Sequence, residues 1–412
     1  MLSRRIAKLH ANLAAFGGST KEERRRCREK VMLEYNWRNI SQYTDSQFFA
    51  FTQDRTFPVD LYKSERLMVI LVPEHNAMSG GIFSFFSIAT QMRRLKPYHG
   101  YDAIVMTRPN KHNLTYFRNT NFVNSENVHR FEQILLCEGA KEVYLQIPEY
   151  ATEDFVDLLS LAELNYLKER KVYINILNQN IKLMPERDRY AQLYQLSNDI
   201  TQSVAHHAYF NQNIADKYGL PTLLLPPYTD LGAYPPSNDH VKEKLIIYSP
   251  DEAEYKHACL EIIRAKLPEF TLIEIKDITF DKFMNYATRC LFSITFGEGF
   301  DGYLAQPIHQ GGIGFAVYDE RFFPSAQFKK YFNIFSTPTD MIETICDKIR
   351  ILNENREAYR RLNREFVQEY KILYKFDEYI GQLTKLACRQ FEIFPGSVNS
   401  MPQPNHDERI PA

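Results

Sequence analysis

Three glycines, at positions 297, 299 and 302, are spaced as Gly-x-Gly-x-x-Gly, and Glu298 stands between the first two. Glycines allow backbone amide groups to approach a phosphate closely, and the N-terminus of a helix favours negative charge. The apolar run 291–295 before this loop predicts a strand, and a helix is expected after the loop. Loops of this kind bind the phosphate groups of nucleotides.

The dinucleotide-binding interpretation of this loop requires more than the three glycines. In that fingerprint a crossover helix follows, and an acid about 20 residues further on holds the ribose. Here about a dozen residues separate Gly302 from the next predicted strand, 314–318, and the acid Asp319 arrives early. The spacing therefore disfavours an NAD-dependent oxidoreductase, which is kept as an alternative.

The segment 290–319 resembles the donor-binding segment of GT-B glycosyltransferases of the retaining family 4 type (glycosyltransferase group 1). That family carries Glu-Gly-Phe-Gly, a second Glu eight residues after the first, and a Gly five residues later. In this chain Glu298 begins the same Glu-Gly-Phe run, Gln306 stands eight residues on, and Gly311 stands five further. A strand follows in both cases.

The resemblance implies that Glu298 contacts the hydroxyl groups of a donor sugar as the catalytic residue, and that Gln306 holds the ribose. Gln306 replaces the family's second Glu, but an amide can still hydrogen-bond a hydroxyl group. Asp301 stands where the family has Gly, which bears on how the loop approaches the sugar. An ordinary loop acid is the alternative interpretation of Glu298. The other donor-binding residues that the resemblance implies are Gly297, Gly299, Phe300, Asp301, Gly302 and Tyr303.

Other polar or glycine-rich turns follow predicted strands in the first half of the chain. Gly80 and Gly81 resemble the family's loop near the acceptor and the donor phosphate, or form a plain strand-to-helix turn. Asn178 and Asn180 end a strand where the family often carries a sugar-contacting His, or belong to a polar turn. We predict that these residues line the acceptor side of a cleft.

Two histidines and one lysine complete the candidate site. His206 and His207 follow a strand end similar to the family's Ser-containing one, and one of them is expected to face the cleft; a helix cap or surface pair is the alternative. The family binds the diphosphate with an Arg/Lys pair after the first strand of its second domain. The Arg is missing here, and Lys256 is the candidate for the Lys, or else a solvated helix residue.

Strands and helices alternate twice along the chain, which predicts α/β architecture with parallel sheets. The expected strands lie at 67–72, 103–106, 143–147, 172–177, 200–204 and 222–225, and then at 245–248, 271–275, 291–295 and 314–318. Prolines cluster between the two series, which marks a linker. We therefore predict two Rossmann-like, doubly wound domains that face each other across a cleft (the GT-B fold), with an N-terminal helical extension and C-terminal crossover helices.

The domain boundaries follow from the same patterns. The predicted parts are an N-terminal extension (1–66), an acceptor domain (67–238), a nucleotide-sugar donor domain (239–372), a crossover helix back to the first domain (373–392) and a disordered tail (393–412). In the extension, Leu2, Ile6, Leu9 and Leu13 recur at helical spacing. The basic run 21–30 is either a solvated face or a contact with anionic lipid.

Composition excludes several classes of protein. The formal net charge of -1 gives no reason to expect a nucleic-acid partner. The chain has no apolar run long enough to span a membrane and no signal peptide at its start, so we expect a cytoplasmic protein, with the first 30 residues as a possible peripheral membrane contact. The six cysteines form no CxxC pair, which favours buried free thiols over a metal site.

We therefore expect a glycosyltransferase of the hexosyltransferase type, which moves a sugar from a UDP- or GDP-sugar to a glycan or lipid-linked glycan in polysaccharide or surface glycan synthesis. Retention of configuration is implied by the resemblance. No cofactor and no metal are expected, because no DxD motif stands in a strand-end loop. Besides the oxidoreductase, a non-catalytic GT-B-like binding subunit is an alternative, because Gln306 and the missing Arg depart from the family pattern.

Overall fold

The computed structural model describes residues 4–16, 24, 28, 57–73, 80–109, 128–229, 231, 234, 242–276, 278 and 280–396. The chain divides into two compact units, Met1–Val59 and Asp60–Ala412. The predicted extension therefore ends near residue 59 rather than 66. Residues 60–66 belong to the second unit, where the backbone N–H of Gly139 donates to the carbonyl of Tyr62.

The first unit contains helix α1, Arg4–Ala15, as the leucine spacing predicts. Leu9 and Leu13 are exposed on this helix, whereas Ala11 and Ala15 are buried. Most of the basic run 21–30 lies outside the described residues. Within the described part of the chain, no helix combines the length and hydrophobicity that crossing a bilayer would need.

The second unit contains two parallel sheets, and the larger has seven strands in the order β3-β2-β1-β4-β5-β6-β7. The strand bounds are Arg66–Val72 (β1), Asp102–Thr107 (β2), Val128–His129 (β3), Glu142–Pro148 (β4), Lys171–Asn178 (β5), Ile200–Val204 (β6) and Thr222–Leu224 (β7). The helices and 3-10 turns around them are Val59–Lys63 (η1), Gly80–His99 (α4), Phe131–Leu136 (η3), Glu149–Ala151 (η4), Phe155–Leu158 (α5), Leu161–Lys168 (α6), Ala191–Gln195 (η5), His207–Tyr209 (η6) and Gln212–Tyr218 (α7).

The smaller sheet has five strands in the order β12-β11-β10-β8-β9, again all parallel. Its strands are Glu243–Tyr248 (β8), Thr271–Glu274 (β9), Cys290–Ile294 (β10), Ile313–Val317 (β11) and Ile334–Phe335 (β12). Its helices are Lys256–Lys266 (α8), Phe280–Arg289 (α9), Gly302–His309 (α10), Ala326–Lys330 (η7, a 3-10 turn) and Pro338–Glu354 (α11).

The prediction of two doubly wound α/β sheets is confirmed. Strands β1 and β4 are adjacent in the first sheet and β8 and β10 in the second, so each sheet reverses its strand order at one point. Ligands bind at such reversal points, beyond the carboxyl ends of the strands. The sequence analysis missed β3 and β12, because two residues are too few to show a periodic pattern.

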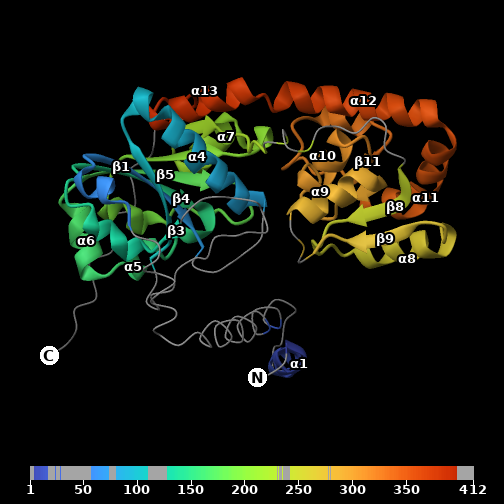
Figure 1. The fold of residues 1–412 in the computed structure, drawn as a ribbon, viewed down its shortest axis with the longest axis horizontal. Helices are drawn as coiled ribbons and strands as arrows, with labels where there is room; N and C mark the ends of the chain where they lie inside the picture. Colours follow the sequence, from blue (N-terminus) through green and yellow to red (C-terminus); the bar gives the residue numbers. More distant parts are fainter. Residues whose placement is uncertain are drawn as a thin grey trace. The chain divides into compact units, whose positions relative to one another are not determined.

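Two long C-terminal helices connect the sheets, as predicted. Helix α12, Arg356–Leu373, contacts α10 and β11, whereas α13, Phe376–Ala387, lies against α4 (Figure 1). Leu383 and Leu386 of α13 are fully buried in the core of the first sheet. The chain then stays ordered beyond the predicted start of the tail, because Ile393 forms a bridge with Thr222. Residues 397–412 lie outside the described residues.

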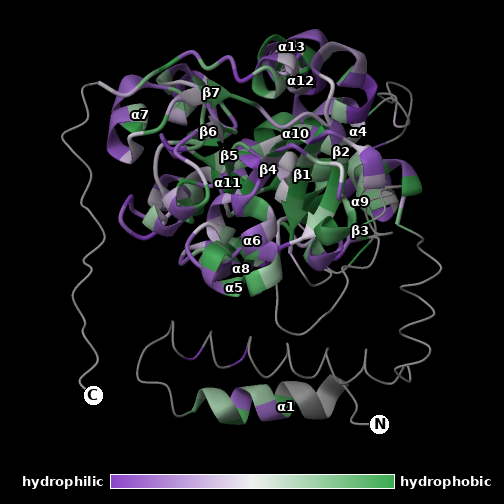
Figure 2. Ribbon diagram, turned by 90° about the vertical axis from the view of Figure 1, so that its left-hand side faces the viewer, coloured by the Kyte–Doolittle hydropathy of each residue, from purple (hydrophilic) through white to green (hydrophobic). Residues whose placement is uncertain are grey.

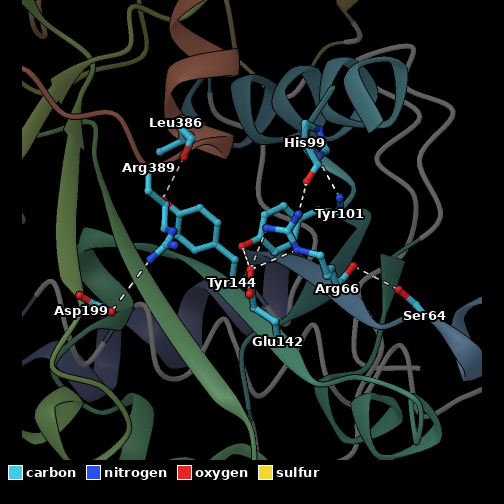
Figure 3. A network of polar contacts seen from close by, with 9 residues as sticks. All are labelled: Ser64, Arg66, His99, Tyr101, Glu142, Tyr144, Asp199, Leu386 and Arg389. Atoms are coloured by element: carbon cyan, nitrogen blue, oxygen red, sulfur yellow. Dashed lines mark hydrogen bonds and ion pairs between the residues drawn. The ribbon is translucent and has the colours of Figure 1, made fainter. Parts of the chain in front are cut away.

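Hydrophobic residues are concentrated in the strands and hydrophilic residues on the outer helices (Figure 2). Four cysteines, Cys137, Cys259, Cys290 and Cys346, are buried free thiols, as expected, whereas Cys388 is a free thiol that is exposed, contrary to the expectation. A polar network closes the first sheet at the amino ends of its strands (Figure 3): Arg66 pairs with Glu142 at 3.0 Å and also donates to the His99 carbonyl, and the Tyr101 hydroxyl donates to Glu142. This edge lies opposite the carboxyl ends and holds the sheet together rather than forming a site.

Candidate functional site

A cavity of about 830 Å³ lies among the loops that follow the carboxyl ends of strands from both sheets. Most of these strands are followed by at least one residue that lines the cavity. Polar lining residues of the first sheet are Arg108 after β2, Glu149 after β4, Asn180 after β5 and His206 after β6; those of the second are Asp251 after β8, Lys276 after β9 and Glu298 after β10. This is where parallel α/β sheets bind ligands.

Glu298 lies in this cavity, held by two residues of the first sheet. Its Oε1 accepts a hydrogen bond of 2.9 Å from Nδ2 of Asn180, and its Oε2 lies 3.6 Å from Nε2 of His206. The His206 ring packs edge-on against Phe322, with ring centroids 5.4 Å apart, and against Tyr209. A carboxylate from one sheet is therefore fixed in orientation by side chains from the other.

The glycines beside Glu298 make room for the protein's own atoms. Gly299 has φ of +85°, which L side chains rarely adopt, and a Cβ there would lie 2.7 Å from the Phe323 ring. A Cβ at Gly297 would lie 2.7 Å from the carboxylate of Asp251. These two glycines thus serve the turn and the contact with Asp251. Neither lines the cavity, whereas Glu298 and Phe300 do.

Asp301 occupies the N-terminus of α10. Its Oδ1 accepts from the backbone N–H groups of Tyr303, at 2.8 Å, and Leu304, at 3.1 Å, and its Oδ2 accepts from the Thr295 hydroxyl. Burial raises the pKa of Asp301 to about 7, despite these hydrogen bonds. The two amides that an anion would use are therefore already taken, so this helix start differs from the open phosphate cradle expected from the glycine spacing.

Three further carboxyl groups share the cavity with Glu298 in the described part of the chain: Glu149, Asp251 and Asp301. Burial raises the pKa of Glu149 to about 7 and also raises that of Asp251, and the charge of Glu298 adds to both shifts. Burial, together with the repulsion from Glu298, favours the protonated form of Glu149 and of Asp251. Although several acids gather at this cavity, no group of three or more His, Cys, Asp or Glu side chains among the described residues is arranged to hold a metal ion.

The structure does not bring Lys256 to the cavity. Its ammonium donates to the Asp251 carbonyl at 3.0 Å and pairs with Glu274 at 3.1 Å, and its side chain is largely buried against Tyr248 and Phe296. Lys276 lines the cavity instead, at the end of β9. Its place was not signalled by the family pattern, which puts the basic pair after the preceding strand.

The other predicted residues separate into two groups. Those that line the cavity are Gly80, Gly81, Asn180, His206, Glu298, Phe300, Asp301, Gly302, Tyr303 and Gln306. Asn178 does not, because it lies inside the first sheet, where its amide donates to Gln202. His207 packs edge-on against Tyr374 and lines a separate cavity of about 310 Å³ beside α13.

Sequence reasoning missed Glu149, Asp251, Arg108 and Lys276. All four come within two or three residues of the end of a parallel strand. Position after a strand end is the signal that could have identified them, since such residues gather at one edge of the sheet. It is a weak signal, because many exposed turns have the same place in the sequence.

No known protein-family model and no curated protein matches the sequence. The chain does resemble solved structures, and the likeness concerns its architecture. Two parallel sheets, a cavity at their carboxyl ends and a C-terminal crossover helix constitute the GT-B fold.

Among the similar structures is that of Anabaena Alr3699/HepE, solved in complex with UDP and glucose. It is 10% identical, with a TM-score of 0.53, over 78% of this chain and 98% of that chain. A glycosyltransferase from Rickettsia africae is 9% identical, with a TM-score of 0.48, over 79% and 99%. The UDP-GlcNAc 2-epimerase of Neisseria meningitidis, solved with bound UDP-GlcNAc, is 10% identical, with a TM-score of 0.37, over 79% and 99%. At these identities the likeness concerns the fold.

Proposed function

We propose that this protein is a glycosyltransferase of the hexosyltransferase type that takes a sugar from a UDP- or GDP-sugar. The observation that carries the proposal is the place of Glu298: it follows β10 at the reversal point of the donor sheet, in the large cavity, with Asn180 and His206 of the other sheet on its carboxylate. A carboxylate held in this way can accept hydrogen bonds from the hydroxyl groups of a sugar.

Gln306 and Lys276 support a nucleotide in the same cavity. The Gln306 side chain is buried, and its Oε1 has no hydrogen-bond partner within the described residues. A buried acceptor without a donor is unfavourable, and a ribose hydroxyl would supply the missing hydrogen bond. Lys276 is exposed at the cavity and makes no ion pair in the described part of the chain, so it can meet the diphosphate.

The chemistry of such a site is mainly positioning and electrostatics. Glu298 orients the sugar, Gln306 holds the ribose, and Lys276 stabilises the charge that develops on the leaving diphosphate. Approach of the two sheets over the cavity would exclude water and favour transfer over hydrolysis. We propose no metal and no cofactor. We also propose that the transfer retains the configuration at the anomeric carbon. This more specific proposal rests on the resemblance of residues 290–319 to retaining enzymes.

We further propose a glycan or lipid-linked glycan as acceptor, and a cytoplasmic protein that contacts the membrane surface through residues 1–30. These residues contain nine Lys or Arg against three Glu, and α1 exposes Leu9 and Leu13. Basic charge combined with an apolar helix face favours an anionic lipid surface. Co-sedimentation with vesicles containing an anionic phospholipid tests this: removal of residues 1–30 should abolish binding, and equal binding would exclude it.

The proposed donor site is tested by calorimetry with UDP-glucose, UDP-galactose, UDP-N-acetylglucosamine and GDP-mannose. One of these should bind, and Glu298→Ala should weaken that binding about 10-fold or more, as expected for loss of hydrogen bonds to a charged group. Glu269→Ala is the matched control, because Glu269 is exposed on the same sheet domain and does not line the cavity. Absence of binding by the whole panel would refute the proposal.

The alternatives give different results in the same experiments. A non-catalytic binding subunit would bind a nucleotide-sugar but release no nucleotide with any acceptor. An NAD-dependent oxidoreductase would bind NAD. The short connection through α10, eight residues long, and the Asp301 carboxyl at its N-terminus both disfavour a dinucleotide at this loop.

A further inference from the structure

Glu149 is a buried acid that has no role in the donor binding proposed above. It begins the 3-10 turn η4 directly after β4, and its side chain lines the cavity although the residue is only 3% exposed. Its Oε1 accepts the backbone N–H of Asn180 at 3.1 Å. Its Oε2 is buried and has no hydrogen-bond partner among the described residues. Such a group is costly to the fold unless it binds something.

Asn180 lies between Glu149 and the donor-side acid. Its backbone N–H binds Glu149, and its side-chain Nδ2 donates to Glu298 at 2.9 Å. The two carboxyl groups therefore both contact a single residue, Asn180, at the edge of the cavity. Glu149 belongs to the first sheet, and Glu298 to the second.

We propose that Glu149 is the catalytic base that takes the proton from the acceptor hydroxyl, an inference that rests on the proposed glycosyl transfer. The hydroxyl proton passes to Oε2 of Glu149 while the hydroxyl oxygen forms a bond to the anomeric carbon on the face that the diphosphate leaves, so that the configuration is retained. The bond from that carbon to the diphosphate oxygen breaks, and the diphosphate leaves with the electron pair. The carboxyl group then returns the proton to solvent.

The electrostatics of the cavity suit this role. Burial raises the pKa of Glu149 to about 7, the backbone N–H groups of Gln179 and Asn180 partly oppose the rise, and the charge of Glu298 adds to it. A base is most effective when its pKa is near the working pH. Among the described residues, the other charged or titratable groups that face the same cavity, tyrosines aside, are Arg108, His206, Asp251, Lys276, Glu298 and Asp301.

The test uses the full chain, the donor from the panel that binds, and water as the acceptor, with release of UDP or GDP measured across the pH range. We expect the wild-type rate to rise with pH and level off above about 7. Glu149→Gln should bind the donor with an unchanged Kd. It should release nucleotide at least ~100-fold more slowly than the wild type, and its rate should no longer depend on pH in this way. Glu149→Asp should retain the pH dependence at a lower rate.

A purely structural role for Glu149 would leave the pH profile unchanged. The inference is therefore overturned if Glu149→Gln keeps the wild-type rate and profile. Failure of the proposed glycosyl transfer gives a different result, because the wild type itself would then bind no nucleotide-sugar or, as a non-catalytic subunit, would bind one and release no nucleotide at any pH. Glu138→Gln, at an exposed acid of the same sheet domain that does not line the cavity, is the matched control and should behave as wild type.

Discussion

Replacing Glu149 by Gln should make the protein more stable at neutral and alkaline pH while removing its proposed activity. The amide has the shape of the protonated carboxyl group, and its oxygen can still accept the N–H of Asn180. The amide nitrogen takes the place of Oε2, which has no partner among the described residues. The variant therefore resembles the protonated wild type at every pH, and it never places a charge in this buried position.

The magnitude follows from the pKa of Glu149, which burial raises from an ordinary value of 4.5 to about 7. At about 1.4 kcal/mol for each pKa unit, the charged carboxylate lowers the free energy of unfolding by about 3 kcal/mol. Below pH 4.5 the group is protonated in both states, so this cost is absent. Between pH 4.5 and about 7 the unfolded chain releases the proton first, so stability falls as the pH rises. Above about 7 the cost is complete.

Urea unfolding followed by circular dichroism measures this directly. At pH about 5 the wild type and Glu149→Gln should differ by less than about 1 kcal/mol, and at pH about 8 the variant should be more stable by about 3 kcal/mol. If the two sheets unfold in separate steps, the step of the first sheet is the one that should change. Titrating groups that do not interact with Glu149 contribute to both proteins equally and cancel in the difference, whereas the repulsion between Glu149 and Glu298 is part of the difference.

Glu138→Gln again provides the control, because Glu138 is exposed and its charge stays in water. Its stability should follow that of the wild type across the same pH range, within about 0.5 kcal/mol. If Glu149→Gln were equally or less stable than the wild type at pH about 8, the buried carboxylate would be well accommodated. The reasoning that links its burial to proton transfer would then fail.

Three further predictions follow from other parts of the second unit. Glu142→Gln should lower the free energy of unfolding at pH 7 by about 1–3 kcal/mol, because the ion pair with Arg66 is lost and the hydrogen bond from Tyr101 no longer ends on a charged group. The hydrogen bonds from Tyr101 and Arg66 hold the pKa of Glu142 low against burial, so this difference in stability should narrow as the pH falls below 4.5 in the same urea titration. Gly299→Ala should lower the free energy of unfolding by about 1–3 kcal/mol, since φ is +85° and the Phe323 ring blocks a Cβ; an unchanged urea midpoint would contradict this. Lys276→Met should weaken donor binding about 10-fold or more in calorimetry, whereas Lys256→Met should leave the Kd within about 2-fold, and the reverse order would return the diphosphate to Lys256.

Much of the architecture could be predicted because each strand carries a continuous apolar run. Strand β1, for example, is buried along almost its whole length, and residues 67–72 read as a strand in the sequence for that reason. The two-residue strands β3 and β12 could not be predicted, because their pairing depends on neighbours rather than on their own pattern. The boundary at residue 59 and the pairing of Ile393 with Thr222 likewise depend on contacts distant in sequence.

The candidate site was predictable where a motif is local. The run from Glu298 to Gln306 is contiguous, so its resemblance to a donor-binding segment could be recognised in the sequence, and the structure places both residues at the cavity. Lys256 shows the limit of this reasoning: its position after β8 suited a diphosphate, but the carboxylate of Glu274, 18 residues away in the sequence, pairs with its charge. Which basic side chain remains available depends on tertiary neighbours.

The sequence by itself therefore determined two doubly wound sheets and one acid-containing loop, because apolar runs and short glycine spacings are local properties. Only the tertiary structure decided what surrounds that loop. It brought Asn180 and His206 to Glu298, filled the start of α10 with Asp301, and buried Glu149 beside Asn180. Burial and the approach of charges distant in sequence set the pKa of each acid, and neither can be read from residue order.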